Sequence, residues 1–273
     1  MGGRGASFLK QIGKGIENNN VGSIEPFLND MPIPDDKMTD IMIDLKKENI
    51  IIYNSMLKLP QDLLNEQLES LRHLTNNNKK LFLLIDKNKP LQIRLAKFTN
   101  KKVQACFSML RNFENPRIYY NANFANKTLK QVEEHTKAQQ DSGWWTRCDE
   151  KNLSRQVTTH EFGHFVNYNL IKKLIDRRCP KKYKELEIAY NNGDISKITE
   201  ITNLQMRMAY SINNQIALIS KKIYGTMRLE DISEYGKTSQ METFAELYTN
   251  AMLSSKPNDM SKALKKYIKE KLK

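Results

Sequence analysis

The stretch at 153–174 constrains the fold most, because a helix with this sequence is apolar on two sides. At 3.6 residues per turn it forms two separate stripes. One stripe contains Leu153, Val157, His160, His164 and Ile171, and the other contains Phe162, Val166, Leu170 and Leu174. Arg177, Arg178 and Pro180 mark the end of the helix. A helix that is apolar on two sides must be covered on both, so the sequence predicts an interior helix.

Within this helix lies the HExxH motif His160-Glu161-Phe162-Gly163-His164. Two histidines four residues apart lie about 40° apart around a helix, so both rings can reach one Zn²⁺ at about 2.0–2.1 Å. Glu161 can then take a proton from a zinc-bound water. The motif also arises by chance in helices, but this chain has only 4 histidines and two of them are here. We therefore predict a zinc site, with Glu161 as general base.

A catalytic zinc site needs a third protein ligand. The longer HExxHxxGxxH pattern is absent, and the remaining histidines, His73 and His135, precede the motif in polar surroundings. A carboxylate from a later helix is therefore expected, and the segment at 241–252 offers Glu242 and Glu246 opposite an apolar face. Two other readings stay open at this point. Acids opposite an apolar stripe are often only solvated, and Ser239 with Glu242 also fits a capping box.

The residues at 160–164 and 233–246 together resemble the catalytic domain of the anthrax lethal factor family, a gluzincin-type zinc metallopeptidase. That family combines HEFGH with a Tyr-Gly-Arg/Lys-Thr stretch and then Glu-x-Phe-Ala-Glu. This chain has these elements in the same order, with Tyr235 seven residues before Glu242. The resemblance implies one zinc ion per chain held by His160, His164 and Glu242, with Glu161 as base, Tyr235 assisting at the oxyanion and Glu246 orienting a ligand.

The resemblance covers two blocks and departs between them. The span from His164 to Glu242 is longer than in lethal factor, and the excess falls between Lys181 and Tyr224, where we expect an inserted hairpin. A looser resemblance, in the stretch at 143–145 and the opening residues, is to a similar domain at the C-termini of bacteriophage minor head proteins. It implies a phage-related or toxin-like role, with phage particle components as candidate partners.

The sequence predicts an α+β fold. We expect a flexible tether at 1–24, a helical arm at 25–78 and a zincin-like metallopeptidase domain at 79–273. Short segments at 81–85, 91–95, 103–107 and 117–120 predict a small twisted sheet above the active-site helix, with a mainly helical subdomain following. The segment at 117–123 is the expected sheet edge for pairing with an extended substrate. Its substrate-binding residues would be Tyr119, Tyr120 and Asn121.

Composition excludes several classes of protein. No run approaches the roughly 18 apolar residues of a membrane span, and the first residues lack the apolar region of a signal peptide. The 3 cysteines have no CxxC spacing, which argues against a disulfide framework or a cysteine-built metal site. The net charge of +13 fits lysines that solvate helix surfaces. No basic stretch has interleaved aromatics, so a nucleic-acid partner is not expected.

These observations predict a zinc-dependent endopeptidase that acts on a protein or peptide substrate. The alternative is a catalytically dormant phage-associated structural or interaction protein that keeps its zinc site. Glu161 argues against dormancy, since structural zinc needs ligands but no base. A second alternative is a basic nucleic-acid-binding module, which would require the lysines to share one face of the protein. We expect the protein in the bacterial host cytoplasm, on the phage virion, or delivered by a non-classical route.

Overall fold

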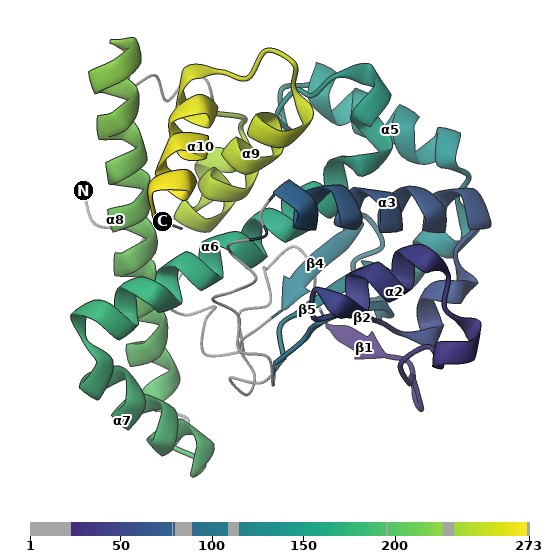
Figure 1. Ribbon diagram of the computed structural model, residues 1–273, viewed down its shortest axis with the longest axis horizontal. Coiled ribbons are helices and arrows are strands. Elements are labelled where there is room, and N and C mark those ends of the chain that lie inside the picture. Colours follow the sequence, from purple (N-terminus) through teal and green to yellow (C-terminus); the bar gives the residue numbers. More distant parts are fainter. Residues whose placement is uncertain are drawn as a thin grey trace.

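The computed structural model describes residues 23–77, 79, 89–108, 115–194, 196–225 and 232–271 (Figure 1). The expected tether lies outside these residues as far as residue 22, and so does the expected strand at 81–85. The strands are β1 (Ile24–Pro26), β2 (Ile50–Ile52), β3 (Leu91–Phe98), β4 (Ala105–Ser108) and β5 (Arg117–Asn121). The α-helices are α2 (Asp40–Lys47), α3 (Gln61–Asn77), α5 (Leu129–Asp141), α6 (Gln156–Arg178), α7 (Pro180–Asn191), α8 (Lys197–Tyr224), α9 (Gln240–Leu253) and α10 (Asp259–Lys271).

The strands form one mixed sheet around β3. Parallel pairing joins β3 to β2 and to β5, while β1 pairs with β3 and β4 with β5 in the antiparallel sense. The register places Ile93 opposite both Ile52 and Ile118. Along the path β1-β3-β5-β4, the described strands leave β4 at one end. The predicted α+β class with a small sheet is confirmed.

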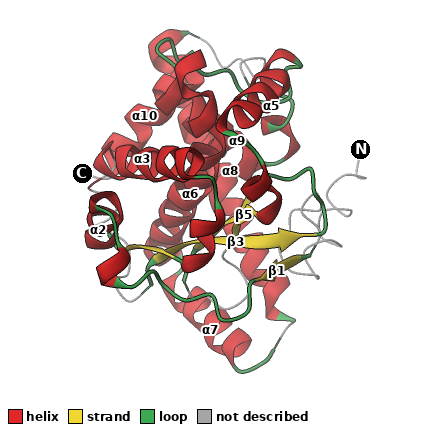
Figure 2. Cartoon of the chain, turned by 90° about the vertical axis from the view of Figure 1, so that its right-hand side faces the viewer, coloured by secondary structure: helices red, strands yellow, loops and turns green. Residues whose placement is uncertain are grey.

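The two faces of the sheet differ in what covers them. Alternate residues such as Leu95 and Tyr120 belong to the main core, which they share with the helices. Their neighbours on the opposite face form a smaller cluster of Ala96, Phe98, Cys106 and Tyr119. In Figure 2 the strands lie in the lower half of the molecule, with most of the helices above them. The helices that carry the candidate site therefore pack on one face only.

The segment at 25–78, which was expected to be a helical arm, contains strands as well as helices. It contains α2 and α3, as expected, but also β2 and most of β1, which pair with β3. Both strands are three residues long, and β2 is the uniform apolar run Ile50-Ile51-Ile52. Such short segments show no alternation, so a periodicity argument does not detect them. This segment therefore completes the sheet, and α3 also packs against α6.

Helix α6 is the interior helix that the sequence predicts. Most of its side chains are buried, from Gln156 at its start to Ile175 near its end. It ends at Arg178, and Pro180 starts α7. In Figure 1 it crosses the centre of the molecule, with α9 and α10 on one side and the strands on the other. Burial on two sides explains why this helix carries apolar residues all around.

Gly163 allows α6 and α9 to pack closely. A Cβ placed on Gly163 would lie 3.1 Å from the Ala245 Cα and 3.2 Å from Cδ1 of Tyr248. The sequence explains this approach from both sides, because Ala245 is itself small. Glycine costs about 1 kcal/mol in a helix interior relative to alanine, and here it gives the close packing of two helices.

We expect Gly163→Ala to lower the free energy of unfolding. The gain of about 1 kcal/mol in helix propensity is opposed by a methyl group forced against the backbone of α9, where overpacking costs about 1–3 kcal/mol. Urea denaturation of both proteins measures the difference. A gain in stability equal to the helix propensity would mean that α9 shifts away without cost.

The remaining helices lie at the periphery. Helix α7 packs against α8, so the region at 181–224 does contain a helical pair (Figure 1).

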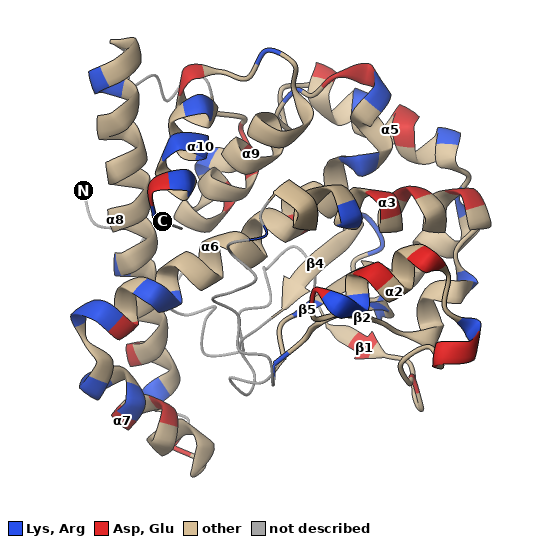
Figure 3. Ribbon diagram, in the orientation of Figure 1, with Lys and Arg blue, Asp and Glu red and all other residues tan. Residues whose placement is uncertain are grey.

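In Figure 3 basic and acidic residues are interspersed along helices such as α2, α5 and α7. Among the described helices, none is both long and apolar enough to cross a lipid bilayer.

Candidate metal centre

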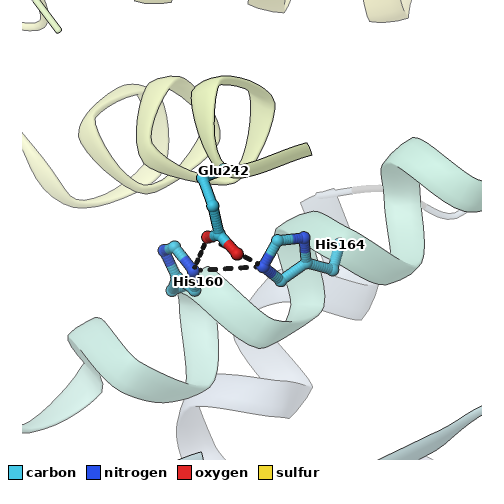
Figure 4. Close-up of side chains that lie close together, drawn as sticks. All are labelled: His160, His164 and Glu242. Carbon is cyan, nitrogen blue, oxygen red and sulfur yellow. Dashed lines mark hydrogen bonds and ion pairs between the residues drawn. The ribbon is translucent and has the colours of Figure 1, made fainter. Parts of the chain in front are cut away.

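Three side chains from two helices converge on one point (Figure 4). His160 and His164 extend from α6, and Glu242 extends from the first turn of α9. Nε2 of His160 lies 3.0 Å from Oε2 of Glu242, and the Nε2 atoms of the two histidines are 3.1 Å apart. Nε2 of His164 is 3.2 Å from the same carboxylate oxygen. All three residues are buried.

The start of α9 fixes the position of Glu242. The Ser239 hydroxyl accepts a hydrogen bond from the Glu242 backbone N–H, which is the first half of the capping box that the sequence suggested. The Glu242 carboxylate, however, points at the two histidines (Figure 4). Because α9 packs directly over Gly163, this carboxylate lies between the two imidazole rings. Of the three readings of Glu242, the geometry favours that of a ligand.

The spacing of these atoms fits a metal ion. Ligands about 2.0–2.1 Å from a tetrahedral metal lie about 3.3 Å from one another, and the three observed separations are 3.0, 3.1 and 3.2 Å. His160 already uses Nδ1 in a bond to Glu246, at 2.8 Å. Its Nε2 is therefore the ring nitrogen that faces the other two ligand atoms. The buried His-His-Glu group could thus hold a metal ion.

Glu246 holds His160 in this orientation. Oε1 of Glu246 lies at Nδ1 of His160, while its Oε2 accepts from the Thr146 backbone N–H at 2.6 Å and from the Ser233 hydroxyl at 2.5 Å. These bonds fix the carboxylate, which in turn fixes the tautomer and ring position of the histidine. The resemblance assigned Glu246 the role of orienting a ligand, and its contacts are those such a role requires.

We expect Glu246→Gln to weaken metal binding. The amide keeps the size of the side chain but loses the negative charge that favours Nδ1–H on His160, and loss of such a partner typically costs about 10–100-fold in affinity. Competition with a chelating dye measures the affinity. Glu234→Gln, at an exposed carboxylate paired with Lys237, is the matched control. Equal affinities in the two variants would remove this role from Glu246.

The electrostatics of the centre depend on burial and on the two carboxylates. Burial by itself lowers the pKa of His160, but hydrogen bonds to Glu242 and Glu246 outweigh it and raise the pKa well above its ordinary value. Burial raises the pKa of Glu242, but His164 and His160 reverse this and leave it far below the usual range. A positive charge is therefore favoured at this point.

Glu161 lies beside the histidines and is also buried. Burial raises the pKa of its carboxyl group, although His160 and His164 act in the opposite direction. The backbone N–H of Phe107 in β4 donates to this carboxylate. The Phe107 ring stacks on His164, with centroids 6.4 Å apart. The strand thus positions both the candidate base and a candidate ligand.

The ring of Tyr235 contacts the rings of His160 and Trp144. Its ring centroid is 5.6 Å from that of His160 and 5.6 Å from that of Trp144. Its backbone N–H donates to the Trp144 carbonyl, which anchors the loop before α9. Burial raises the pKa of the phenol well above its usual value, and the negative charges of Glu242 and Glu161 add to this. The hydroxyl therefore keeps its proton as a donor.

The segment at 117–123, which was expected to be the sheet edge that pairs with a substrate, lies inside the sheet. β5 pairs with β3 on one side and with β4 on the other, so it is not a sheet edge and its backbone is not free to pair with a substrate. Tyr119 belongs to the cluster on the far face, the Tyr120 hydroxyl bonds Thr158, and the Asn121 side chain bonds the Val103 carbonyl. The expectation that 117–123 is the edge is therefore wrong. Among the described strands, β4 forms the edge beside β5, while β1 and β2 lie along the opposite edge.

A cavity of about 670 Å³ opens beside the centre, and its wall includes His160, Glu161 and Tyr235. The residue pattern assigned no role to Phe107, Thr146 or Ser233. Thr146 acts through its backbone N–H, which its residue type does not reveal. Ser233 opens the matched block at 233–246 and Phe107 ends the expected strand at 103–107, but neither residue type by itself indicates a contact with the centre.

Comparison with family models, curated proteins and solved structures finds no match for this chain. Its assignment to the lethal factor family therefore stays a prediction, which rests on the residues at 160–164 and 233–246.

Proposed function

We propose that this protein is a zinc-dependent endopeptidase with a zincin-like fold, related to the lethal factor family. The observation that carries the proposal is the convergence of His160, His164 and Glu242 beside the buried carboxylate of Glu161. A centre with a purely structural role needs the three ligands, but it does not need a fourth, basic group at the same point. The adjoining cavity gives a substrate access to that group.

This donor set suits zinc. Two neutral imidazoles and one carboxylate form a common ligand set of catalytic zinc sites, which leave a fourth position for water. His160, His164 and Glu242 would hold the ion, and Glu246 would keep His160 in place. When bound, zinc lowers the pKa of its water and polarises the carbonyl of the substrate.

The side chains of the protein supply the proton transfers. Glu161 accepts the proton of the attacking water and passes it to the nitrogen of the leaving amine. Its raised pKa suits the first step, because a stronger base takes the proton more readily. The Tyr235 hydroxyl donates a hydrogen bond to the carbonyl oxygen as negative charge develops there.

Tyr235→Phe should lower kcat by about 10²–10³-fold, the cost of losing one oxyanion donor, while zinc stays bound. Only the hydroxyl is removed, so the ring keeps its packing against Trp144 and His160. Steady-state kinetics and metal analysis on the same preparation separate the two effects. If Tyr235 is only a packing residue, the variant will have wild-type kcat.

The proposal is tested by incubating the purified chain with a diverse peptide library. Cleavage should require one zinc per chain, stop on treatment with a chelator and return when zinc is restored. A protein that binds zinc tightly and cleaves nothing would favour the alternative, a dormant phage-associated structural or interaction protein with a retained zinc site.

A further inference from the structure

The cavity beside the metal centre has a strongly basic wall. Lys101, Lys102 and Lys127 line it, together with both tryptophans of the chain, Trp144 and Trp145. The two lysines at 101 and 102 lie in the turn between β3 and β4, and Lys127 follows the short helix after β5. Because β3 and β5 are parallel, their carboxyl ends meet at the same edge of the sheet. The topology thus brings three cations together.

Few negative charges oppose these lysines. Among the described residues of the cavity wall, the acids are Glu161 and Glu246, and both belong to the metal centre. Glu246 is already bonded to His160, Thr146 and Ser233. The charge of Lys127 reaches His135 on the same cavity wall. Burial is the larger cause of the lowered pKa of His135, and the positive charge of Lys127 is the smaller one. The lysine end of the cavity therefore carries uncompensated positive charge.

Gln104 gives a second, independent sign of a ligand. It lines the cavity, the residue is 6% exposed, and neither its Nε2 nor its Oε1 has a hydrogen-bond partner among the residues that the structure describes. A buried amide without a partner lowers the stability of the folded protein, because it has lost its hydrogen bonds to water. A bound peptide would satisfy it through a backbone or carboxylate group.

We infer that this cavity binds an acidic segment of the substrate, with aspartate or glutamate side chains at the lysines and the cleaved bond at the metal. The inference rests on the proposed peptidase function. The volume of about 670 Å³ lies within the roughly 300–1,000 Å³ of ligand pockets. Indole rings can pack against the aliphatic parts of the peptide while the lysines select its charge.

Binding can be measured without cleavage. Because both tryptophans line the cavity, their fluorescence reports on its occupation in the Glu161→Gln protein. The probes are end-capped random copolymers of Glu and Ala, Gln and Ala, or Lys and Ala. At low ionic strength the Glu copolymer should bind about tenfold more tightly than the Gln copolymer, an effect that three exposed charge pairs can supply. The Lys copolymer should bind most weakly.

Two triple variants of equal net charge separate the cavity from general attraction to a basic protein. Replacing Lys101, Lys102 and Lys127 by Ala should remove the preference for Glu. Replacing the exposed Lys184, Lys221 and Lys222 by Ala should leave most of the preference for the Glu copolymer. Equal losses in the two triples, or no loss in the first, would overturn the inference.

Gln104→Leu tests the amide separately. Removing a buried polar group without a partner should leave the melting temperature unchanged or higher, while copolymer binding weakens. A lower melting temperature with unchanged binding would mean that the amide serves the fold rather than a ligand.

The two proposals can fail separately. Selective binding of the Glu copolymer with no peptide cleaved by the zinc protein would contradict the peptidase function and support the acidic cavity. Cleavage of a library with no enrichment of acidic residues near the cut, and with KM unchanged when an acid is replaced by its amide, would contradict the cavity and support the peptidase.

Discussion

Glu161→Gln is expected to lower peptidase turnover by about 10²–10⁴-fold or more, while zinc content stays at one ion per chain. The amide has the size of the carboxylate and can still accept the hydrogen bond from Phe107 that holds the native side chain. What it cannot do is take a proton from water. The loss should therefore appear in kcat, because neither the metal ligands nor the cavity wall near the lysines has changed.

Metal analysis and steady-state kinetics on one preparation check this result. Glu185→Gln, an exposed position on α7, is a matched control that removes the same charge far from the centre. The enzyme assignment fails if a confirmed substrate is cut equally fast by the wild type and by Glu161→Gln. Loss of zinc in the variant would instead place Glu161 among the residues that hold the ion.

The sequence predicts the centre better than it predicts the sheet, and the reason is physical. His160 and His164 lie four residues apart on a long helix, so the helix geometry alone brings their rings together. Gly163 leaves room for a close approach at that point, and α9 fills it with the Ala245 backbone. The local pattern left Glu242 open, since a capping residue and a metal ligand look alike in sequence until the partner helix is placed.

The sheet depends on pairing between distant segments, which residue patterns do not encode. β5 is a regular strand whose residues from Ile118 to Asn121 are all buried, and the pairing of β4 along it shows that it is internal. β1 and β2 are too short to show any period. The contacts of Glu246 with Thr146 and Ser233 join three separate parts of the chain. Such contacts follow from the tertiary fold.

His164→Ala and Glu242→Ala should each abolish tight zinc binding. Loss of an orienting partner alone costs about 10–100-fold in affinity, so loss of a direct ligand should cost more. Zinc at 100 times its dissociation constant would stabilise the wild type by about 2.7 kcal/mol, which raises its melting temperature by several degrees. The variants should show no such rise, because they lack the site through which zinc acts on the folded state.

Comparison of Glu242→Ala with Glu246→Ala decides which carboxylate binds the ion. Glu242 shares one oxygen between both histidines, whereas Glu246 reaches only the far nitrogen of His160. Glu242→Ala should therefore lose zinc, and Glu246→Ala should bind it with reduced affinity and keep part of the thermal shift. If Glu242→Ala binds zinc as the wild type does and Glu246→Ala does not, the two carboxylates have exchanged roles. His160 would then present Nδ1 to the metal, and the site would have to rearrange from the geometry in Figure 4.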